Sequence, residues 1–264
     1  GVSCPVKFIL TDASYAGSET FPLSIGAFPG SSSVNTFTIE AGTTSSISGS
    51  NATAIFNLNG CKYVSIDGRV NGTGSTPALT VTNTNTTAPA VVFINESSNN
   101  HVKYTNLKSD NTTASSGGVV FFSTTTGANG NDNDTLSYCN IGPNVGTPTN
   151  GVVSVGTTTT SATNNSNNLV TNCNIFDFFS ATSDCNGILI GAGNDAWSVS
   201  NNSFYETASR TFTTSSSVFS AIQISNSSGN NFLLSGNAIG GSATAAGGSP
   251  LTILGNGVFR AIRL

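Results

Sequence analysis

The feature that most constrains the fold is an internal repeat of about 33 residues. One set of segments reads HVKYTNL, TLSYCNI, LVTNCNI, SVSNNSF and LLSGNAI. Their closing apolar residues are spaced 34, 34, 29 and 35 positions apart, and an aliphatic residue stands five positions before each of them. A repeat this short cannot bury its apolar side alone and must stack on its neighbours. The two columns are Val102, Leu136, Val170, Val199 and Leu234, and Leu107, Ile141, Ile175, Phe204 and Ile239.

A second set of apolar positions has the same period, and each member has a partner two residues earlier. The pairs are Phe56 and Leu58, Val92 and Ile94, Val120 and Phe122, Val153 and Val155, Ile188 and Ile190, Ile222 and Ile224, and Thr252 and Leu254. Period-2 alternation between Gly, Asn, Ser and Thr turns predicts short strands, and no long window has a helical apolar stripe. Like residues recurring once per coil favour an all-β parallel β-helix, a solenoid of roughly eight coils of about 33 residues. A β-sandwich would lack such columns. Residues 1–264 are expected to form a single β-helix domain.

The composition excludes several classes of function. Only 8% of the residues are charged, with 8 Lys and Arg against 12 Asp and Glu, so the net charge is -4. A nucleic-acid binder needs a clustered basic surface, which this chain lacks. The apolar runs are short, so we expect no membrane insertion. Five Cys do not define a disulfide framework.

The first family of segments also predicts a polar corner. The residue two positions before each closing apolar residue is small or polar: Thr105, Cys139, Cys173, Asn202 and Asn237. Such side chains, stacked at a bend, can hydrogen-bond to the adjacent coil and to backbone groups that the turn leaves unpaired. Metal binding or redox chemistry is the alternative for Cys139 and Cys173. Their spacing of one coil, with no His nearby, favours a buried stacked pair.

The first 107 residues resemble a known family. The matching stretches are GVSCPV, IGAFPGSSSVNTFTI, LNGCKYVSIDGRVNGTGS and FINESSNNHVKYTNL. They are similar to the pectate-lyase-like right-handed parallel β-helix regions of large secreted or cell-surface proteins of Bacteroidetes. Cys4 is a departure, because the family usually has Gly there. The resemblance implies a right-handed β-helix, export by the type IX secretion system to the cell surface or medium, and a chain that is a segment of a longer protein.

The carboxylates offer few candidates for catalysis or metal binding. Polysaccharide hydrolases and lyases on this fold need carboxylates gathered on one face. Asp177, Asp184 and Asp195 are one such candidate cluster. Asp132 and Asp134 lie in a Gly- and Asn-rich loop, where calcium binding is an open alternative to a turn role. We expect no catalytic residue, no metal site and no cofactor apart from that calcium.

Two further polar residues have structural explanations. Asp67 and Arg69, in SIDGRVNG, form either a functional acid and cation pair or a turn in which Arg69 pairs with a carboxylate or caps the stack. The second explanation is preferred. His101 is the only His of the chain, so neither a Ser-His-Asp arrangement nor a site with two His ligands can form. We expect its side chain to be solvated at a turn.

Aromatic residues provide the candidate binding site. If Val92 and Ile94 point inward, Phe93 points outward, and by the same alternation Phe121 points outward one coil later. Trp197 and Phe232 occupy a corner column one coil apart. Exposed aromatic side chains suit sugar rings or a protein partner. The alternative is that a loop or a flanking domain covers them.

These observations support three hypotheses of function. The preferred one is a non-catalytic, extracellular or cell-surface β-helix module, such as an adhesin, stalk or filament segment. Its partners would be a surface glycan or neighbouring domains of the same polypeptide. The alternative is a polysaccharide lyase or glycoside hydrolase on the same fold, although a shared fold does not imply a shared function. Ice binding is disfavoured because the Thr runs do not recur in aligned ranks.

Overall fold

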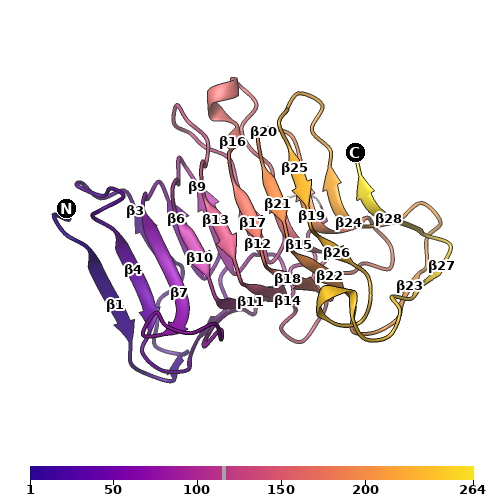
Figure 1. The fold of residues 1–264 in the computed structure, drawn as a ribbon, viewed down its shortest axis with the longest axis horizontal. Helices are drawn as coiled ribbons and strands as arrows, with labels where there is room; N and C mark the ends of the chain where they lie inside the picture. Colours follow the sequence, from indigo (N-terminus) through magenta and orange to yellow (C-terminus); the bar gives the residue numbers. More distant parts are fainter. Residues whose placement is uncertain (115–116) are drawn as a thin grey trace.

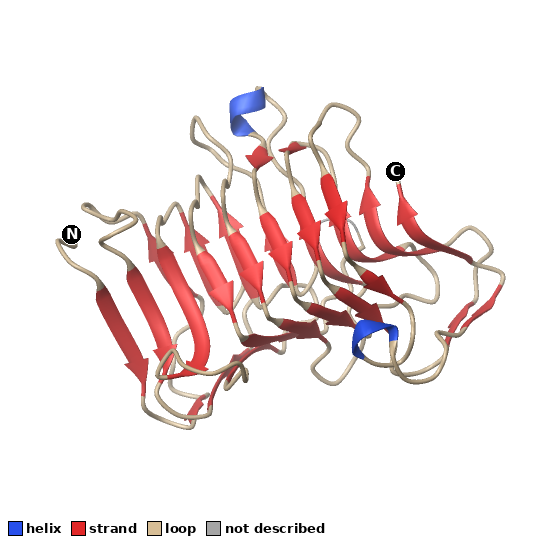
Figure 2. Cartoon of the chain, viewed as in Figure 1, coloured by secondary structure: helices blue, strands red, loops and turns tan. Residues whose placement is uncertain are grey.

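The computed structural model describes residues 1–114 and 117–264, and nearly all regular structure in them is β. The only helical segments in these ranges are two single 3-10 turns, η1 (Ser161–Thr163) and η2 (Thr244–Ala246). Figure 2 shows strands joined by loops along the whole length of the molecule. None of the described helices has the length and apolar character needed to cross a membrane.

The strands form three parallel sheets of eight strands each, and each sheet takes one strand from every passage of the chain. Sheet A contains β1 (Val6–Leu10), β4 (Phe37–Ala41), β7 (Val64–Val70), β10 (His101–Lys103), β13 (Thr135–Ser137), β17 (Leu169–Thr171), β21 (Ser198–Ser200) and β25 (Leu233–Ser235). Sheet B contains β2 (Ser14–Tyr15), β5 (Ser45–Gly49), β8 (Leu79–Asn83), β11 (Thr105–Ser109), β14 (Asn140–Gly142), β18 (Asn174–Phe176), β22 (Ser203–Tyr205) and β26 (Ala238–Ile239). Sheet C contains β3 (Leu23–Gly26), β6 (Phe56–Asn59), β9 (Val91–Ile94), β12 (Val120–Phe122), β15 (Asn150–Ser154), β19 (Cys185–Ile190), β24 (Val218–Ile224) and β28 (Val258–Arg263).

One passage through sheets A, B and C is called a coil below. Figure 1 shows successive coils side by side, with the two chain ends at opposite ends of the longest axis. Two short pairs lie outside the three sheets, β16 (Asn165–Ser166) with β20 (Asn194–Asp195) and β23 (Arg210–Phe212) with β27 (Ile253–Gly255). Parallel strands require a long connection between neighbours, and here the other two sheets supply it. The predicted all-β class is confirmed, and the three eight-stranded parallel sheets are the arrangement expected of a parallel β-helix.

The first pair of apolar columns is confirmed in register. In sheet A, Val102 pairs with Leu136, which pairs with Val170, and in sheet B, Leu107 pairs with Ile141, which pairs with Ile175. All of these side chains are buried in one continuous core. Because the ladders are parallel, each apolar side chain packs on a similar one in the next coil.

The second set of columns is partly wrong. In sheet C, Leu58 pairs with Phe93, and Phe93 pairs with Phe122. The inward residue of β9 is therefore Phe93, where Ile94 was predicted. In β15 the inward residue is Ser154, where Val155 was predicted. Leu254 lies outside sheet C, in β27. A continuous apolar run such as VVFI does not fix its own phase, and a shift of one residue exchanges the two faces of a strand.

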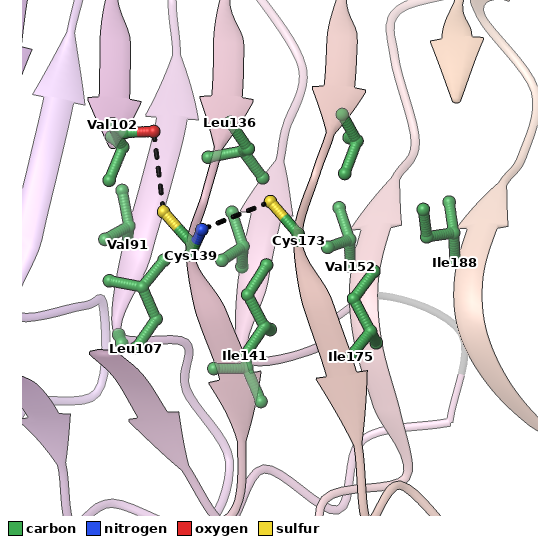
Figure 3. Close-up of a cluster of buried hydrophobic side chains, with 14 of the residues drawn as sticks. Val91, Val102, Leu107, Leu136, Cys139, Ile141, Val152, Cys173, Ile175 and Ile188 are labelled. Atoms are coloured by element: carbon green, nitrogen blue, oxygen red, sulfur yellow. Dashed lines mark hydrogen bonds between the residues drawn. The ribbon is translucent and has the colours of Figure 1, made fainter. Parts of the chain in front are cut away.

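Stacked side chains fill the interior. The rings of Phe93 and Phe122 lie 4.3 Å apart at an interplanar angle of 5°, and Trp197 meets Phe122 edge-on at 4.8 Å. Figure 3 shows aliphatic residues of successive coils around Cys139 and Cys173. The apolar side chains of each coil are thus covered by the neighbouring coils, without any further element of the fold.

The polar corner between sheets A and B is also confirmed. The backbone N–H of Cys173 donates to Oδ1 of Asn202 at 2.9 Å, and the N–H of Asn202 donates to Oδ1 of Asn237 at 3.0 Å. Cys139 N–H lies 3.5 Å from Sγ of Cys173 (Figure 3). The side chains of Cys173, Asn202 and Asn237 thus each satisfy a backbone donor of the preceding coil. Both thiols are buried, as the stacked-pair hypothesis predicts, and they are not joined in a disulfide.

We expect a charge on an inward column of sheet C to prevent cooperative folding. Val152 is fully buried between Val120 and Ile188. Val152→Asp would place a carboxylate there without a partner, at a cost of several kcal/mol. Thr158→Asp lies on an exposed loop and should change stability by less than about 0.5 kcal/mol. Thermal unfolding followed by circular dichroism checks this, and equal losses in the two variants would contradict the register of sheet C.

Candidate functional site

Of the four aromatic residues predicted to be exposed, two are fully buried. Phe93 has no exposed surface and lies in the core, because it occupies the inward position of β9. Trp197 is equally buried, and its Nε1 donates to the backbone carbonyl of Asn165 at 2.9 Å. The column at the corner before sheet A points inward, so a large aromatic residue there fills the interior. Neither side chain can offer a contact at the surface.

The other two predicted aromatic residues are partly accessible. Phe121 does point outward from sheet C and is half-buried, in register with Val92 and Val153. Val153 is fully buried on this outer face although it was assigned to the core column. Phe232 is half-buried and packs against the edge of the core. The structure therefore does not bring the four aromatic residues together.

The three carboxylates of the candidate catalytic cluster are held separately. Asp177 forms an ion pair with Arg210 at 2.7 Å, and Asp184 forms one with Arg263 at 2.6 Å. Asp195 accepts the backbone N–H of Asn230 at 2.8 Å. Each carboxylate is thus engaged by a different part of the chain.

Asp177 instead lies close to Glu206 through a shared Arg210. Burial raises the pKa of Glu206 to about 8, against the opposing effect of Arg210, whose Nε lies 2.5 Å from Oε2. Oε1 of Glu206 accepts the backbone N–H of Phe178, and the side chain has no exposed surface. Both oxygens of Asp177 are occupied by Thr207 and Arg210. Substrate therefore cannot reach Glu206, and the cluster ties neighbouring coils together.

Asp132 and Asp134 also have separate roles. Asp132 accepts the N–H of Ser166 at 2.7 Å. Asp134 is fully buried between Asn100 and Asn168 in a ladder at the corner before sheet A. Its Oδ1 accepts the N–H of Asn100 at 2.8 Å, whereas its Oδ2 has no hydrogen-bond partner among the described residues. Within these residues, no three His, Cys, Asp or Glu side chains are placed to hold a metal ion together.

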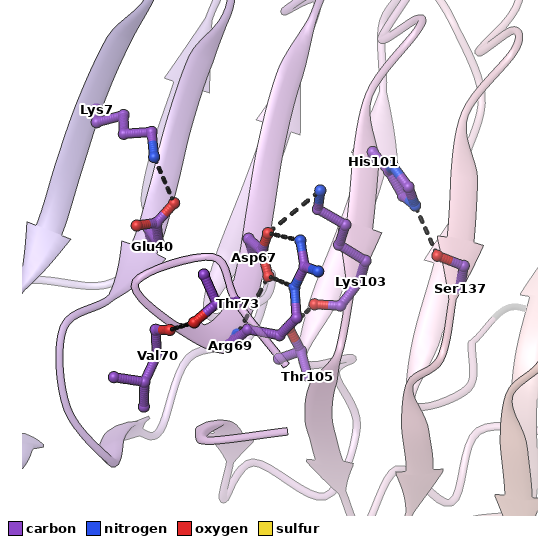
Figure 4. A network of polar contacts seen from close by, with 10 residues as sticks. All are labelled: Lys7, Glu40, Asp67, Arg69, Val70, Thr73, His101, Lys103, Thr105 and Ser137. Atoms are coloured by element: carbon purple, nitrogen blue, oxygen red, sulfur yellow. Dashed lines mark hydrogen bonds and ion pairs between the residues drawn. The ribbon is translucent and has the colours of Figure 1, made fainter. Parts of the chain in front are cut away.

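The Asp67 and Arg69 pair is the centre of a charged network on the outer face of sheet A (Figure 4). Arg69 holds buried Asp67 through two bonds, Nε to Oδ1 at 2.9 Å and a terminal nitrogen to Oδ2 at 2.6 Å. Lys103 of the next coil lies 3.2 Å from the same carboxylate. Burial alone would raise the pKa of Asp67, but Arg69 and Lys103 outweigh it and lower that pKa. Pairing of Arg69 with a carboxylate is confirmed.

His101 differs from the prediction. It begins β10, is half-buried, and its Nε2 lies 2.7 Å from Oγ of Ser137. Burial and the positive charge of Lys103 lower its pKa to about 4. The ring is therefore neutral at physiological pH and forms part of the sheet surface rather than a solvated turn.

A more extended polar surface lies on the outer face of sheet B. Asn106, Asn140 and Asn174 occupy one outward column of successive coils. Nδ2 of Asn140 donates to Oδ1 of Asn106 at 2.7 Å, and Nδ2 of Asn174 donates to Oδ1 of Asn140 at 2.8 Å. Nδ2 of Asn106 reaches Oγ1 of Thr80 at 3.3 Å. We call these three residues the amide ladder.

Two aromatic pairs border the amide ladder. On the far side of sheet B, Phe176 and Tyr205 stack at 5.2 Å and 6°. At the corner between sheets A and B, Tyr104 and Tyr138 stack at 4.6 Å and 2°, and Arg69 lies over the Tyr104 ring. Tyr104 and Tyr138 each stand two residues before an Asn of the ladder, so this corner pair lies beside the ladder.

The corner Tyr residues have an unusual backbone conformation. Tyr104 and Tyr138 have φ of 49° and 54°, in the left-handed region. The next coils place Asn172, Asn201 and then Gly236 at this position, which are residues that tolerate the conformation well. A bulky residue there costs of order 1–3 kcal/mol. Two successive Tyr at strained positions mark this edge of sheet B as a candidate contact surface.

Between the borders, the surface is hollowed at Gly142. The hollow has a volume of about 480 Å³ and runs from Thr80 to Thr244 across the amide ladder. A Cβ at Gly142 would come within 2.8 Å of Cζ of Phe176, so the tip of that ring lies over the glycine. Lys108 lies on the other side of Gly142 in the same outward column. We call this surface, from the amide ladder to Lys108 and Phe176, the sheet B hollow.

The sheet B hollow was not among the sites predicted from the sequence. The Asn residues are visible in the repeats TNL, CNI and CNI, two residues after Tyr104, Tyr138 and Asn172. This polar column beside the apolar column of sheet B could have indicated a polar outer surface. The sequence did not show that the Tyr residues stand at a bend rather than within a strand, and this decides their direction.

Comparison with known proteins adds no family to this description. No family model matches the chain, and no curated protein or solved structure matches it either. The function is therefore inferred from the side chains and the geometry of the chain itself.

We expect Asp134→Asn to stabilise the protein at neutral pH. Burial raises the pKa of Asp134 well above its usual value, so the folded state binds this proton more tightly than the unfolded state does. The associated stability is present below the unfolded pKa, about 3.9, and is lost as pH rises through the folded pKa. Asn does not titrate, and its amide can donate to a carbonyl, as Asn168 does to Asn131.

The gain should be about 1–3 kcal/mol at pH 7 and should shrink towards pH 4. Melting temperatures of both proteins at pH 4, 5.5, 7 and 8.5 provide the measurement. A stability difference that does not change with pH would show that Asp134 does not titrate as inferred.

Loss of Arg69 should destabilise the outer face of sheet A. Arg69→Ala leaves Asp67 buried with Lys103 as its remaining ionic partner, at an expected cost of about 1–3 kcal/mol. The loss should shrink in acid, because the low pKa of Asp67 gives stability that disappears as pH falls through the folded pKa. Arg263→Ala is the control, since its pair with Asp184 is more exposed than that of Arg69 with Asp67 and worth about 0–1 kcal/mol. Urea unfolding of the two variants should rank them in that order, and the reverse order would refute the role of Arg69.

Proposed function

We propose that the chain is a right-handed parallel β-helix module of a secreted or cell-surface protein and that it acts without catalysis, as an adhesin, stalk or filament segment. The observation that carries the proposal is the continuous stacking of strands in three parallel eight-stranded sheets. A stack in which each coil contacts only its neighbours suits an elongated structural element. The resemblance of residues 1–107 to type IX secretion cargo of Bacteroidetes supports export.

The outer surfaces support a contact role. Tyr138 is 45% exposed at a strained backbone position, and the sheet B hollow gathers amides, a lysine and aromatic rings. Exposed aromatic residues beside polar groups are typical of contact surfaces. This surface replaces Phe93 and Trp197 as the candidate for contact with a glycan.

Neighbouring domains of the same polypeptide are the second partner in this proposal. The outermost coils expose apolar side chains, among them Phe8 at 60%, Phe259 at 45% and Ile262 at 46%. Their strands also present unpaired backbone groups, which favour the addition of another strand. A domain packed on either surface would cover both features.

The alternative function is a polysaccharide lyase or glycoside hydrolase. Glu206 has the raised pKa expected of a general acid, and Asp177 lies nearby. Glu206 is inaccessible, however, and both carboxylates are held by Arg210. These contacts favour a structural role for the pair.

A turnover assay tests the proposal. The purified chain would be incubated with neutral and acidic polysaccharides, with and without calcium, and products would be measured as new reducing ends and as unsaturated sugars. We expect no product above the level of heat-inactivated protein.

Product formation that Glu206→Gln or Asp177→Asn abolishes would overturn the non-catalytic function. Asp184→Asn is the matched control, because it removes a carboxylate that lies in a different ion pair. Product that persists in all three variants would overturn the proposal equally and would direct attention to another face.

A further inference from the structure

We propose that the sheet B hollow binds an uncharged, unbranched polysaccharide that lies along the stacking direction of the coils. This inference rests on the proposed function, because it names the ligand of a non-catalytic module. It goes further in assigning one face, one orientation and one class of glycan. The residues concerned are Asn106, Asn140, Asn174, Lys108 and Phe176.

The amide ladder supplies donors and acceptors in a regular row. A side-chain amide has two N–H donors and two acceptor sites on its oxygen. Each Asn of the ladder uses one N–H towards the preceding coil, and the oxygens of Asn106 and Asn140 each accept one such bond. The second N–H of each amide and the remaining acceptor sites have no partner among the described residues. Because all three amides point the same way, the free groups recur in one orientation.

The spacing of the ladder suits a chain of sugar rings. Neighbouring parallel strands lie about 4.8 Å apart, which is close to the length of one pyranose unit in an extended glycan. The hollow spans five coils, from β8 to β22, so four strand spacings give it a length of about 19 Å. A glycan laid along it would present hydroxyl groups to each amide in turn.

The aromatic borders supply apolar contact. Phe176 leans over Gly142, and the stacked Tyr205 continues the same wall into the next coil. A residue with a side chain at position 142 would fill this part of the hollow, and its Cβ would meet both the Phe176 ring and its backbone oxygen. The C–H surface of a sugar ring can pack against such a wall while its hydroxyl groups bond to the amides. On the opposite border, the hydroxyl-bearing rings of Tyr104 and Tyr138 are held rigid by stacking.

The charges favour an uncharged glycan. Lys108 is the one cationic residue among the described residues that line the hollow. Nearby, Asp110 is buried and accepts the N–H groups of Asn144 and Val145, and Asp177 is paired with Arg210, while the chain as a whole carries a net charge of -4. With its charges close to balance, this surface offers a polyanion no clustered positive charge to bind. Lys108 then serves as a hydrogen-bond donor to hydroxyl or ring oxygens.

The test is affinity electrophoresis of the folded protein through gels that contain a neutral polysaccharide, either hydroxyethylcellulose or galactomannan, or an acidic one, either polygalacturonate or chondroitin sulfate. We expect retardation by at least one neutral polymer. Asn140→Ala and Phe176→Ala should weaken that retardation at least tenfold in Kd, which corresponds to about 1.4 kcal/mol.

Asn57→Ala is the matched control, because Asn57 is a half-buried Asn on the outer face of sheet C. It should leave the retardation unchanged, and circular dichroism confirms that each variant folds. If a variant fails to fold, Lys108→Ala and Tyr205→Phe test opposite ends of the same hollow, with expected losses in Kd of several-fold and of twofold or less, respectively.

The results separate this inference from the proposed function. Retardation by the acidic polymers alone, lost in Lys108→Ala, would overturn the uncharged class. Retardation by no polymer, or retardation that the sheet B variants leave unchanged, would overturn the site. Neither result affects the non-catalytic function, which fails only if the turnover assay yields product.

Discussion

The structure depends on the in-register parallel ladder between successive coils. Parallel pairing places each residue beside the equivalent residue of the next coil, so an apolar residue stacks on an apolar one and an amide bonds to an amide. Val102 with Leu136 and Asn106 with Asn140 are two results of the same constraint, one inside and one outside. Binding surfaces on such a protein therefore take the form of rows that follow the stacking direction.

The corners turn this constraint into local detail. From β10 onward, the chain bends between sheets A and B through a single residue in the left-handed conformation, and in the later coils an inward side chain next to it satisfies a backbone donor. Tyr104 and Tyr138 accept the strain of that bend, and their rings then stand at the border of the sheet B hollow. At the corner before sheet A, the inward-pointing column leaves Asp134 buried in a ladder of Asn side chains, where its charge is destabilising.

The charged residues mostly serve to join coils. Asp67 is held by an Arg of its own coil and by a Lys of the next, and Arg210 links Asp177 of the preceding coil with Glu206. With only 8% of residues charged, few ionic groups remain for chemistry. Burial, with a further contribution from Asp177, raises the pKa of Glu206 at a position that no substrate could reach.

The repeat of about 33 residues by itself determined the fold class, the stacked columns of sheets A and B, and the buried Cys139 and Cys173 pair, because these follow from periodicity and residue type. Tertiary structure decided the phase of sheet C, where the run VVFI could present either face and the coil contacts placed Phe93 inside. It also decided that Trp197 fills the interior and that the Tyr pair points out, since direction at a corner depends on a single backbone angle. A column of like residues in the sequence predicts which residues stack on one another. Whether those side chains point into the core or out to the surface is set by the bend of the chain.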